Sequence, residues 1–81
     1  MELNETIEMM QSSDYKERFK AEYYQLKIRY EKLEDMLVKY SAGTLEFEPS
    51  CSYTILTEQF NFMRAYLHVL KVRANIEGIE L

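Results

Sequence analysis

The stretch TEQFNFMRAYLHVLKVRANIE, Thr57 to Glu77, decides the fold because its apolar residues recur with the period of a long helix. We expect this helix to run from about Ser52 to Glu77 and to end at Gly78, since glycine readily adopts the left-handed conformation of a helix end. Steps of three and four residues place one apolar seam along it: Tyr53, Leu56, Phe60, Met63, Leu67, Leu70 and Ala74. Such a seam is typical of a helix that packs lengthwise against another helix.

A matching helix is predicted upstream, from about Tyr15 to Tyr40. Asp14 is a suitable N-cap for it, and Glu17 stands at capping-box spacing. This helix carries a seam with the same steps: Phe19, Tyr23, Leu26, Tyr30, Leu33, Leu37 and Tyr40. Two matching seams predict that the two helices pack against each other.

The connection between the helices, residues 41–52, is short and contains the helix breakers Gly43 and Pro49. A short connection makes the helices antiparallel neighbours, so the sequence predicts an all-α fold with an antiparallel helical hairpin over residues 14–81. Phe47 belongs to an apolar side of the connection, and we expect it to fold back over the end of the hairpin.

Residues 1–13 are expected to be an N-terminal extension of the hairpin domain. Leu3, Ile7 and Met10 are spaced as on one face of a short amphipathic helix. A helix of this length is not stable alone in water, so we expect the segment either to pack on a neighbouring chain or to fray.

A second apolar stripe, here called the outer stripe, runs beside the first seam of the downstream helix. Its members are Ile55, Gln59, Phe62, Tyr66, Val69, Arg73 and Ile76. One partner helix cannot cover both stripes, and an apolar stripe left in water promotes aggregation. We therefore expect a symmetric homo-oligomer, either a dimer or a tetramer built as a dimer of dimers, in which hairpins meet through this stripe.

Gln59 and Arg73 are the polar members of the outer stripe, and two interpretations of them stay open. As register devices they would fix the alignment of the helices, with Arg73 paired to an acidic residue across the interface or extending its head to water from an apolar stem. As pocket residues they would line a polar site between subunits.

Composition limits the other ways of stabilising so small a domain. In a chain of 81 residues, Cys51 and His68 are the only residues of their types, so neither an internal disulfide nor a Cys/His metal site can form within one chain. The sequence contains no activated nucleophile and no phosphate-binding glycine loop. We therefore expect no enzyme activity, no cofactor and no metal.

Charge and hydropathy bear on the partners and on the compartment. The formal net charge of −4 argues against binding of long nucleic acid through its phosphates. No apolar run approaches the length of a membrane span and no signal peptide is visible, so we expect no membrane partner and a cytoplasmic protein.

Basic and tyrosine side chains alternate in the first half of the upstream helix. Among them are Tyr15, Arg18 and Arg29. A tyrosine ring can stack on a nucleotide base while a guanidinium binds its phosphate. Glutamates interrupt the pattern, so it is a weak indication by itself.

The two helices and their connection resemble a family of short proteins from tailed bacteriophages, including crAss-like phages. The resemblance is carried by YKERFKAEYYQLKIRYEKLEDMLVKY, residues 15–40, then AGTLEFEPSC, residues 42–51, and LTEQFNFMRAYLHVLKVRANIEGIEL, residues 56–81. Ser52 stands where relatives are expected to have proline, which affects only the start of the second helix.

The chain is further similar to phage sponge proteins, which bind cyclic nucleotide signals of bacterial immune systems such as CBASS. This resemblance implies a small-molecule cyclic nucleotide as ligand, bound without cleavage in the cytoplasm of an infected bacterium. It carries over six candidate binding residues: Tyr15, Arg18, Arg29, Gln59, Tyr66 and Arg73. The alternative is a non-catalytic helical module that binds a protein, such as a host-factor inhibitor acting through its bundle surface.

Overall fold

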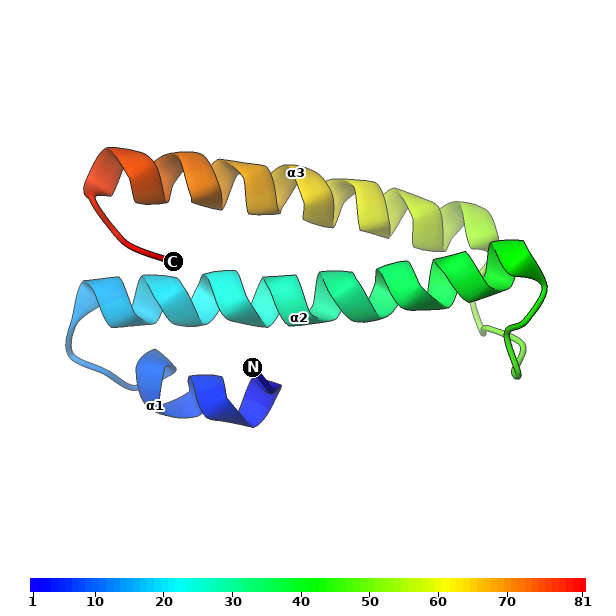
Figure 1. Cartoon of the computed structure of the whole chain (residues 1–81), viewed down its shortest axis with the longest axis horizontal. Helices are drawn as coiled ribbons and strands as arrows, with labels where there is room; N and C mark the ends of the chain where they lie inside the picture. The colour runs from blue at the N-terminus through cyan, green and yellow to red at the C-terminus, as the bar shows by residue number, and fades with distance from the viewer.

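Two long helices dominate the computed structural model, which describes all residues from Met1 to Leu81 (Figure 1). The chain begins with a 3-10 turn, η1 (Leu3–Thr6), and a short helix, α1 (Ile7–Met10). The long helices α2 (Tyr15–Ala42) and α3 (Tyr53–Glu77) follow, and there is no strand. They lie antiparallel along each other, so the predictions of an all-helical chain and of two packed long helices are confirmed.

The ends of the long helices follow the local sequence signals. The side chains of Asp14 and Ser52 cap α2 and α3 by accepting hydrogen bonds from backbone N–H groups of the first turn. Gly43 and Gly78 end the same helices with φ angles of 75° and 70°. Only glycine adopts this left-handed conformation without a steric penalty, which is why both helices end there. None of the helices is both long and apolar enough to span a membrane.

Aromatic pairs fix the register between α2 and α3. Tyr40 stacks on Tyr53 near the connection, with ring centroids 4.9 Å apart. Midway along the hairpin, Tyr30 stacks on Phe60 at 4.7 Å with the ring planes 12° apart. All four residues belong to the predicted seams, so the seams do face each other.

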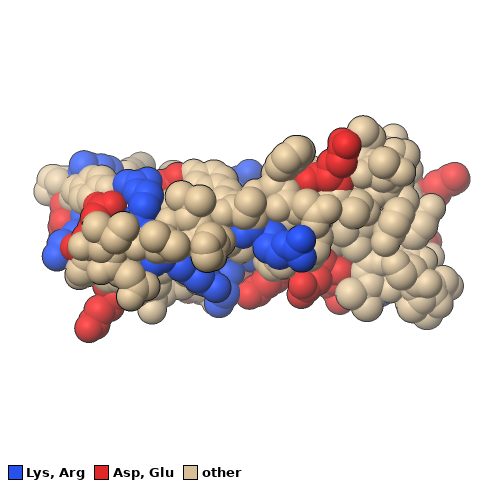
Figure 2. Space-filling view, turned by 90° about the horizontal axis from the view of Figure 1, so that it is seen from above, with Lys and Arg blue, Asp and Glu red and all other residues tan.

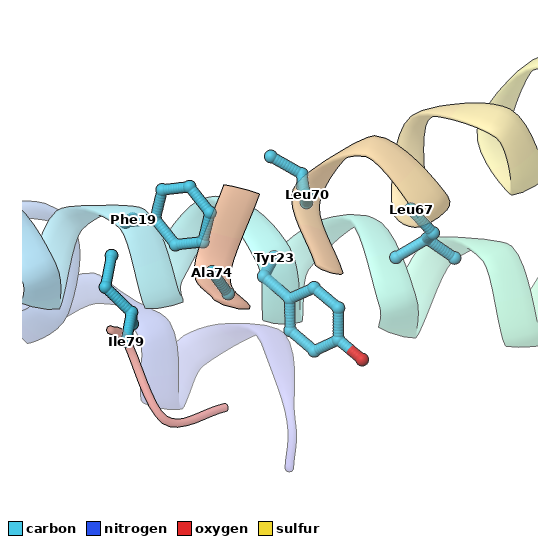
Figure 3. Close-up of a cluster of buried hydrophobic side chains, with 6 residues drawn as sticks. All are labelled: Phe19, Tyr23, Leu67, Leu70, Ala74 and Ile79. Carbon is cyan, nitrogen blue, oxygen red and sulfur yellow. The ribbon is translucent and has the colours of Figure 1, made fainter. Parts of the chain in front are cut away.

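The hydrophobic core lies at the end of the hairpin where α2 begins and α3 finishes. Figure 3 shows its six buried side chains: Phe19, Tyr23, Leu67, Leu70, Ala74 and Ile79. Ile79 follows the helix, and its N–H donates to the Ala74 carbonyl at 2.8 Å, which turns the tail back and buries the side chain in the core. Toward the connection, Leu37 is the only buried side chain.

The N-terminal segment differs from its prediction. It packs on α2 of its own chain, and Gln25 of α2 donates a hydrogen bond to the hydroxyl of buried Thr6 at 2.9 Å. Ile7 and Met10 of the predicted apolar face are exposed. The segment is thus joined to α2 by a polar contact at Thr6, with Leu3 and Met9 half-buried beside it.

The prediction for Phe47 was wrong. Its side chain is 58% exposed and does not cover the end of the hairpin. It borders a hollow of about 380 Å³ that the connection forms together with Tyr40, Leu45 and Pro49. The Tyr40–Tyr53 stack already occupies the end of the interhelical seam, so no space is left there for a third ring.

Candidate functional site

The outer stripe of α3 lies on the surface of the single chain. Its apolar members are exposed, from 45% for Tyr66 to 78% for Ile76. The prediction that α2 leaves this stripe uncovered is therefore confirmed. Figure 2 views the molecule from the side of α3 and shows uncharged atoms over much of this face, with basic side chains only in its centre and toward the end where α3 finishes.

Arg73 is the centre of a cluster at that end. Its Nη2 donates to the Tyr15 hydroxyl at 2.8 Å, and its Nε donates to Oε2 of Glu77 at 3.3 Å. The Tyr15 hydroxyl in turn donates to Oε1 of Glu77 at 2.8 Å. Three side chains from the start of α2 and the end of α3 thus form a closed set of hydrogen bonds.

The guanidinium of Arg73 also rests on an aromatic face. Its central carbon lies 5.0 Å from the centroid of the buried Phe19 ring, a cation–π distance. Arg73 is therefore oriented by the ring beneath it and by hydrogen bonds at its edge. Of the two interpretations of Arg73, pairing with an acid is observed, but within its own helix, four residues along at Glu77.

Tyr66 lies one heptad before Arg73 on α3 and makes a similar contact. Its hydroxyl donates to a carboxylate oxygen of Glu22, which lies one heptad after Tyr15 on α2. The ring is 45% exposed, so one of its faces is accessible to a partner or to a planar ligand.

Arg29 and Gln59 occupy the next positions of the same register. Each lies one further heptad along its helix, Arg29 after Glu22 and Gln59 before Tyr66, and both are exposed. We call the two observed cross-helix pairs, Tyr15–Arg73 and Glu22–Tyr66, the cross-helix ladder. Three of the six predicted site residues, Tyr15, Tyr66 and Arg73, are in this ladder, and Arg29 and Gln59 continue its spacing without a contact between them.

Arg18 is the predicted residue whose side chain is directed away from the ladder. Its Nη1 donates to the carbonyl of Ser12 at 2.9 Å, so the side chain points back toward the N-terminal segment. Arg18 lies three residues beyond Tyr15, and this offset directs its head away from the outer stripe.

Hydrogen bonding in the cluster changes the proton affinity of Tyr15. Donation to the Glu77 carboxylate raises the pKa of the Tyr15 phenol above its usual value of 10.0, and removal from water raises it further. The positive charge of Arg73 opposes both effects but does not cancel them. The phenol is therefore a hydrogen-bond donor over the whole physiological pH range.

The larger hollows of the surface lie away from the ladder. One of about 590 Å³ is bordered by residues from both helices near the connection, Leu37, Val38, Tyr53 and Phe60 among them. Another of about 610 Å³ lies beside the C-terminal tail, next to Tyr23, Lys71 and Ile79. The ladder itself is an open face of the chain.

Sequence reasoning missed the two carboxylates of the site. Glu77 could have been identified as the acid four residues after Arg73, a spacing that favours ion pairs on a helix. Glu22 had no such signal, because its contact with Tyr66 depends on the interhelical register.

Comparison with known proteins gives one match. The family model described as Sequestin matches residues 13–76, which is most of the chain and includes both long helices. The name of that family points to sequestration of a molecule, and the match confirms the resemblance to sequestering proteins. No significantly similar curated protein and no significantly similar solved structure was found.

Proposed function

Because the chain belongs to the Sequestin family, we propose that it sequesters a small nucleotide signal, a cyclic dinucleotide in the first place, and releases it uncleaved. A cyclic ADP-ribose type of molecule is the second ligand class. The setting we propose is the cytoplasm of a bacterium infected by a tailed phage, where removal of such a signal would prevent activation of CBASS-type immunity.

The observation that carries this proposal is the cluster around Arg73. A guanidinium held on the Phe19 ring has its Nε and Nη2 donors side by side, and these donors now bind Glu77 and Tyr15. A phosphate would favour the same pair of donors. The exposed Tyr66 ring lies two turns away on the same face and could stack on a base. Gln59 and Arg29 would add polar contacts further along.

Assembly is part of the proposal, because the ladder is open in a single chain. Two hairpins meeting through the outer stripe would bury its exposed apolar side chains and bring two ladders together. A cyclic dinucleotide is nearly two-fold symmetric, so a site on the two-fold axis could offer Tyr66 and Arg73 to each half.

The exposed outer stripe also fits the competing class, a hairpin that binds a protein. Isothermal calorimetry with a panel of cyclic nucleotides and cyclic ADP-ribose isomers separates the two classes. We expect saturable binding of at least one cyclic nucleotide, with ligand recovered intact after the protein is denatured by heat. No binding by any member of the panel would favour the protein-binding class, and recovery of cleaved ligand would indicate an enzyme.

A further inference from the structure

Glu77 occupies the edge of Arg73 that an incoming phosphate would use. One carboxylate oxygen accepts from Arg73 Nε at 3.3 Å, and the other accepts from the Tyr15 hydroxyl at 2.8 Å. A phosphate likewise presents two oxygens to a guanidinium edge. One oxygen of the Glu77 carboxylate, on Nε, and the Tyr15 hydroxyl oxygen, on Nη2, therefore stand where the two oxygens of a ligand anion would be.

The negative charge of Glu77 would make it compete with a ligand phosphate for Arg73. Arg73 and Glu77 together carry no net charge, so the closed cluster offers little attraction to an anion. A phosphate placed beside Glu77 would face a like charge, which disfavours its binding. Ligand and carboxylate cannot both use the Nε edge of Arg73.

The position of Glu77 at the end of α3 also allows its carboxylate to rotate away from Arg73. It is the last residue of α3, and Gly78 with its φ of 70° follows directly. The side chains of Arg73 and Glu77 are 44% and 31% exposed, and ion pairs in contact with water contribute little, about 0–1 kcal/mol. Rotation of the carboxylate into solvent would break this weak ion pair and the hydrogen bond from Tyr15, and water or a ligand oxygen could replace both contacts while Phe19 still supports the guanidinium.

We propose that Glu77 is an intramolecular gate of the Arg73 anion site, holding the guanidinium in position in the free protein and yielding its place to ligand phosphate. This inference rests on the proposed function for the identity of the ligand, but the competition between Glu77 and an anion can be measured without it. Because of this competition, the Arg73 site binds a ligand anion more weakly, and releases it faster, than it would without Glu77.

The test compares the wild-type chain with Glu77→Gln, which keeps the shape of the side chain and removes its charge. Inorganic phosphate is titrated while the NMR signals of the arginine Nε–H groups are followed, with the Arg73 signal assigned from its absence in Arg73→Lys. We expect Glu77→Gln to bind phosphate at Arg73 about two- to fivefold more tightly, the range set by one exposed charge pair. Calorimetry with the panel of cyclic nucleotides is repeated on both proteins.

Glu31→Gln is the matched control. Glu31 pairs with Lys27 at the same four-residue spacing, so this variant changes the net charge equally but at a pair outside the ladder. We expect its phosphate response at Arg73 to equal that of the wild type. An equal gain in Glu31→Gln would show that net charge alone is responsible and would overturn the gate.

The remaining outcomes separate the gate from the proposed function. If Glu77→Gln responds to phosphate as the wild type does, Glu77 is only a structural clasp and the gate is refuted, whatever the panel shows. If phosphate binding improves but no cyclic nucleotide binds either protein, the gate stands and the proposed function fails. Tighter binding of both phosphate and a cyclic nucleotide supports the two together.

Discussion

Arg73 has an observed structural role and a proposed binding role. It ties the start of α2 to the end of α3 through Tyr15, and it presents a guanidinium edge on the open face of the hairpin. A structural clasp and an anion contact respond differently to substitution. At the scale of one residue, the two roles can therefore be separated.

Replacement of Arg73 by alanine tests its role in binding. A charge-assisted contact contributes about 1.5–3 kcal/mol, so we expect cyclic nucleotide affinity to fall roughly ten- to a hundredfold in Arg73→Ala, as measured by calorimetry. Arg73→Lys should restore only part of this loss, because the planar fork is missing. If affinity falls merely in step with a loss of assembly on sizing columns, Arg73 is a register device.

Tyr15 makes the stability of the hairpin depend on pH in the alkaline range. Its pKa is raised in the folded chain by donation to Glu77, so the stabilisation is complete below the unfolded pKa of about 10 and is lost as pH rises through the higher folded value. We expect the unfolding free energy to fall more steeply above pH 10 in the wild type than in Tyr15→Phe, as followed by urea denaturation. Parallel profiles would contradict the hydrogen bond.

At the scale of elements, the two helices were predictable and the segments outside them were not. The seams and caps depend on residues a few positions apart, and the stacks of Tyr30 on Phe60 and Tyr40 on Tyr53 follow from them. The return of the tail at Ile79 depends on a cavity that exists only after α2 and α3 have packed. No local periodicity could indicate it.

Ile79 should therefore contribute more stability than its place at the end of the chain implies. Its side chain is 6% exposed, and truncation of a buried isoleucine costs about 2–5 kcal/mol. We expect Ile79→Ala to lower the urea midpoint clearly. Ile7→Ala, the same substitution at a side chain that is 47% exposed, serves as control and should change the midpoint little.

At the scale of the whole molecule, the chain buries few residues and exposes many large apolar ones. Only 9 of 81 residues are buried, while Phe62 and Ile76 of the outer stripe are 73% and 78% exposed. The stripe was visible in the sequence because heptad spacing is local. The ladder was only partly visible, since the contact of Glu22 with Tyr66 joins residues that the register alone brings together.

Assembly through the outer stripe makes a direct prediction for Phe62. A carboxylate at this position would be costly to bury, so we expect Phe62→Asp to yield a monomer of 9.8 kDa where the wild type is larger in light scattering. Phe47→Asp is the control, because Phe47 is also exposed but lies in the connection. A wild-type chain that is itself monomeric at micromolar concentration would refute the proposed assembly.

The core lies at the end of the hairpin opposite to the connection. Local opening should therefore begin beside the connection and not, as is more usual, at helix ends near the chain termini. Arg73 and Tyr15 touch across 58 residues of sequence, whereas the helix ends beside the connection meet across a short loop but bury only Leu37. Within α2 and α3, the turns beside the connection should therefore exchange their amide hydrogens fastest, and the turns that form the core slowest. Because the best-packed contacts also close the longest loop, folding is expected to wait on the encounter of the two ends of the chain.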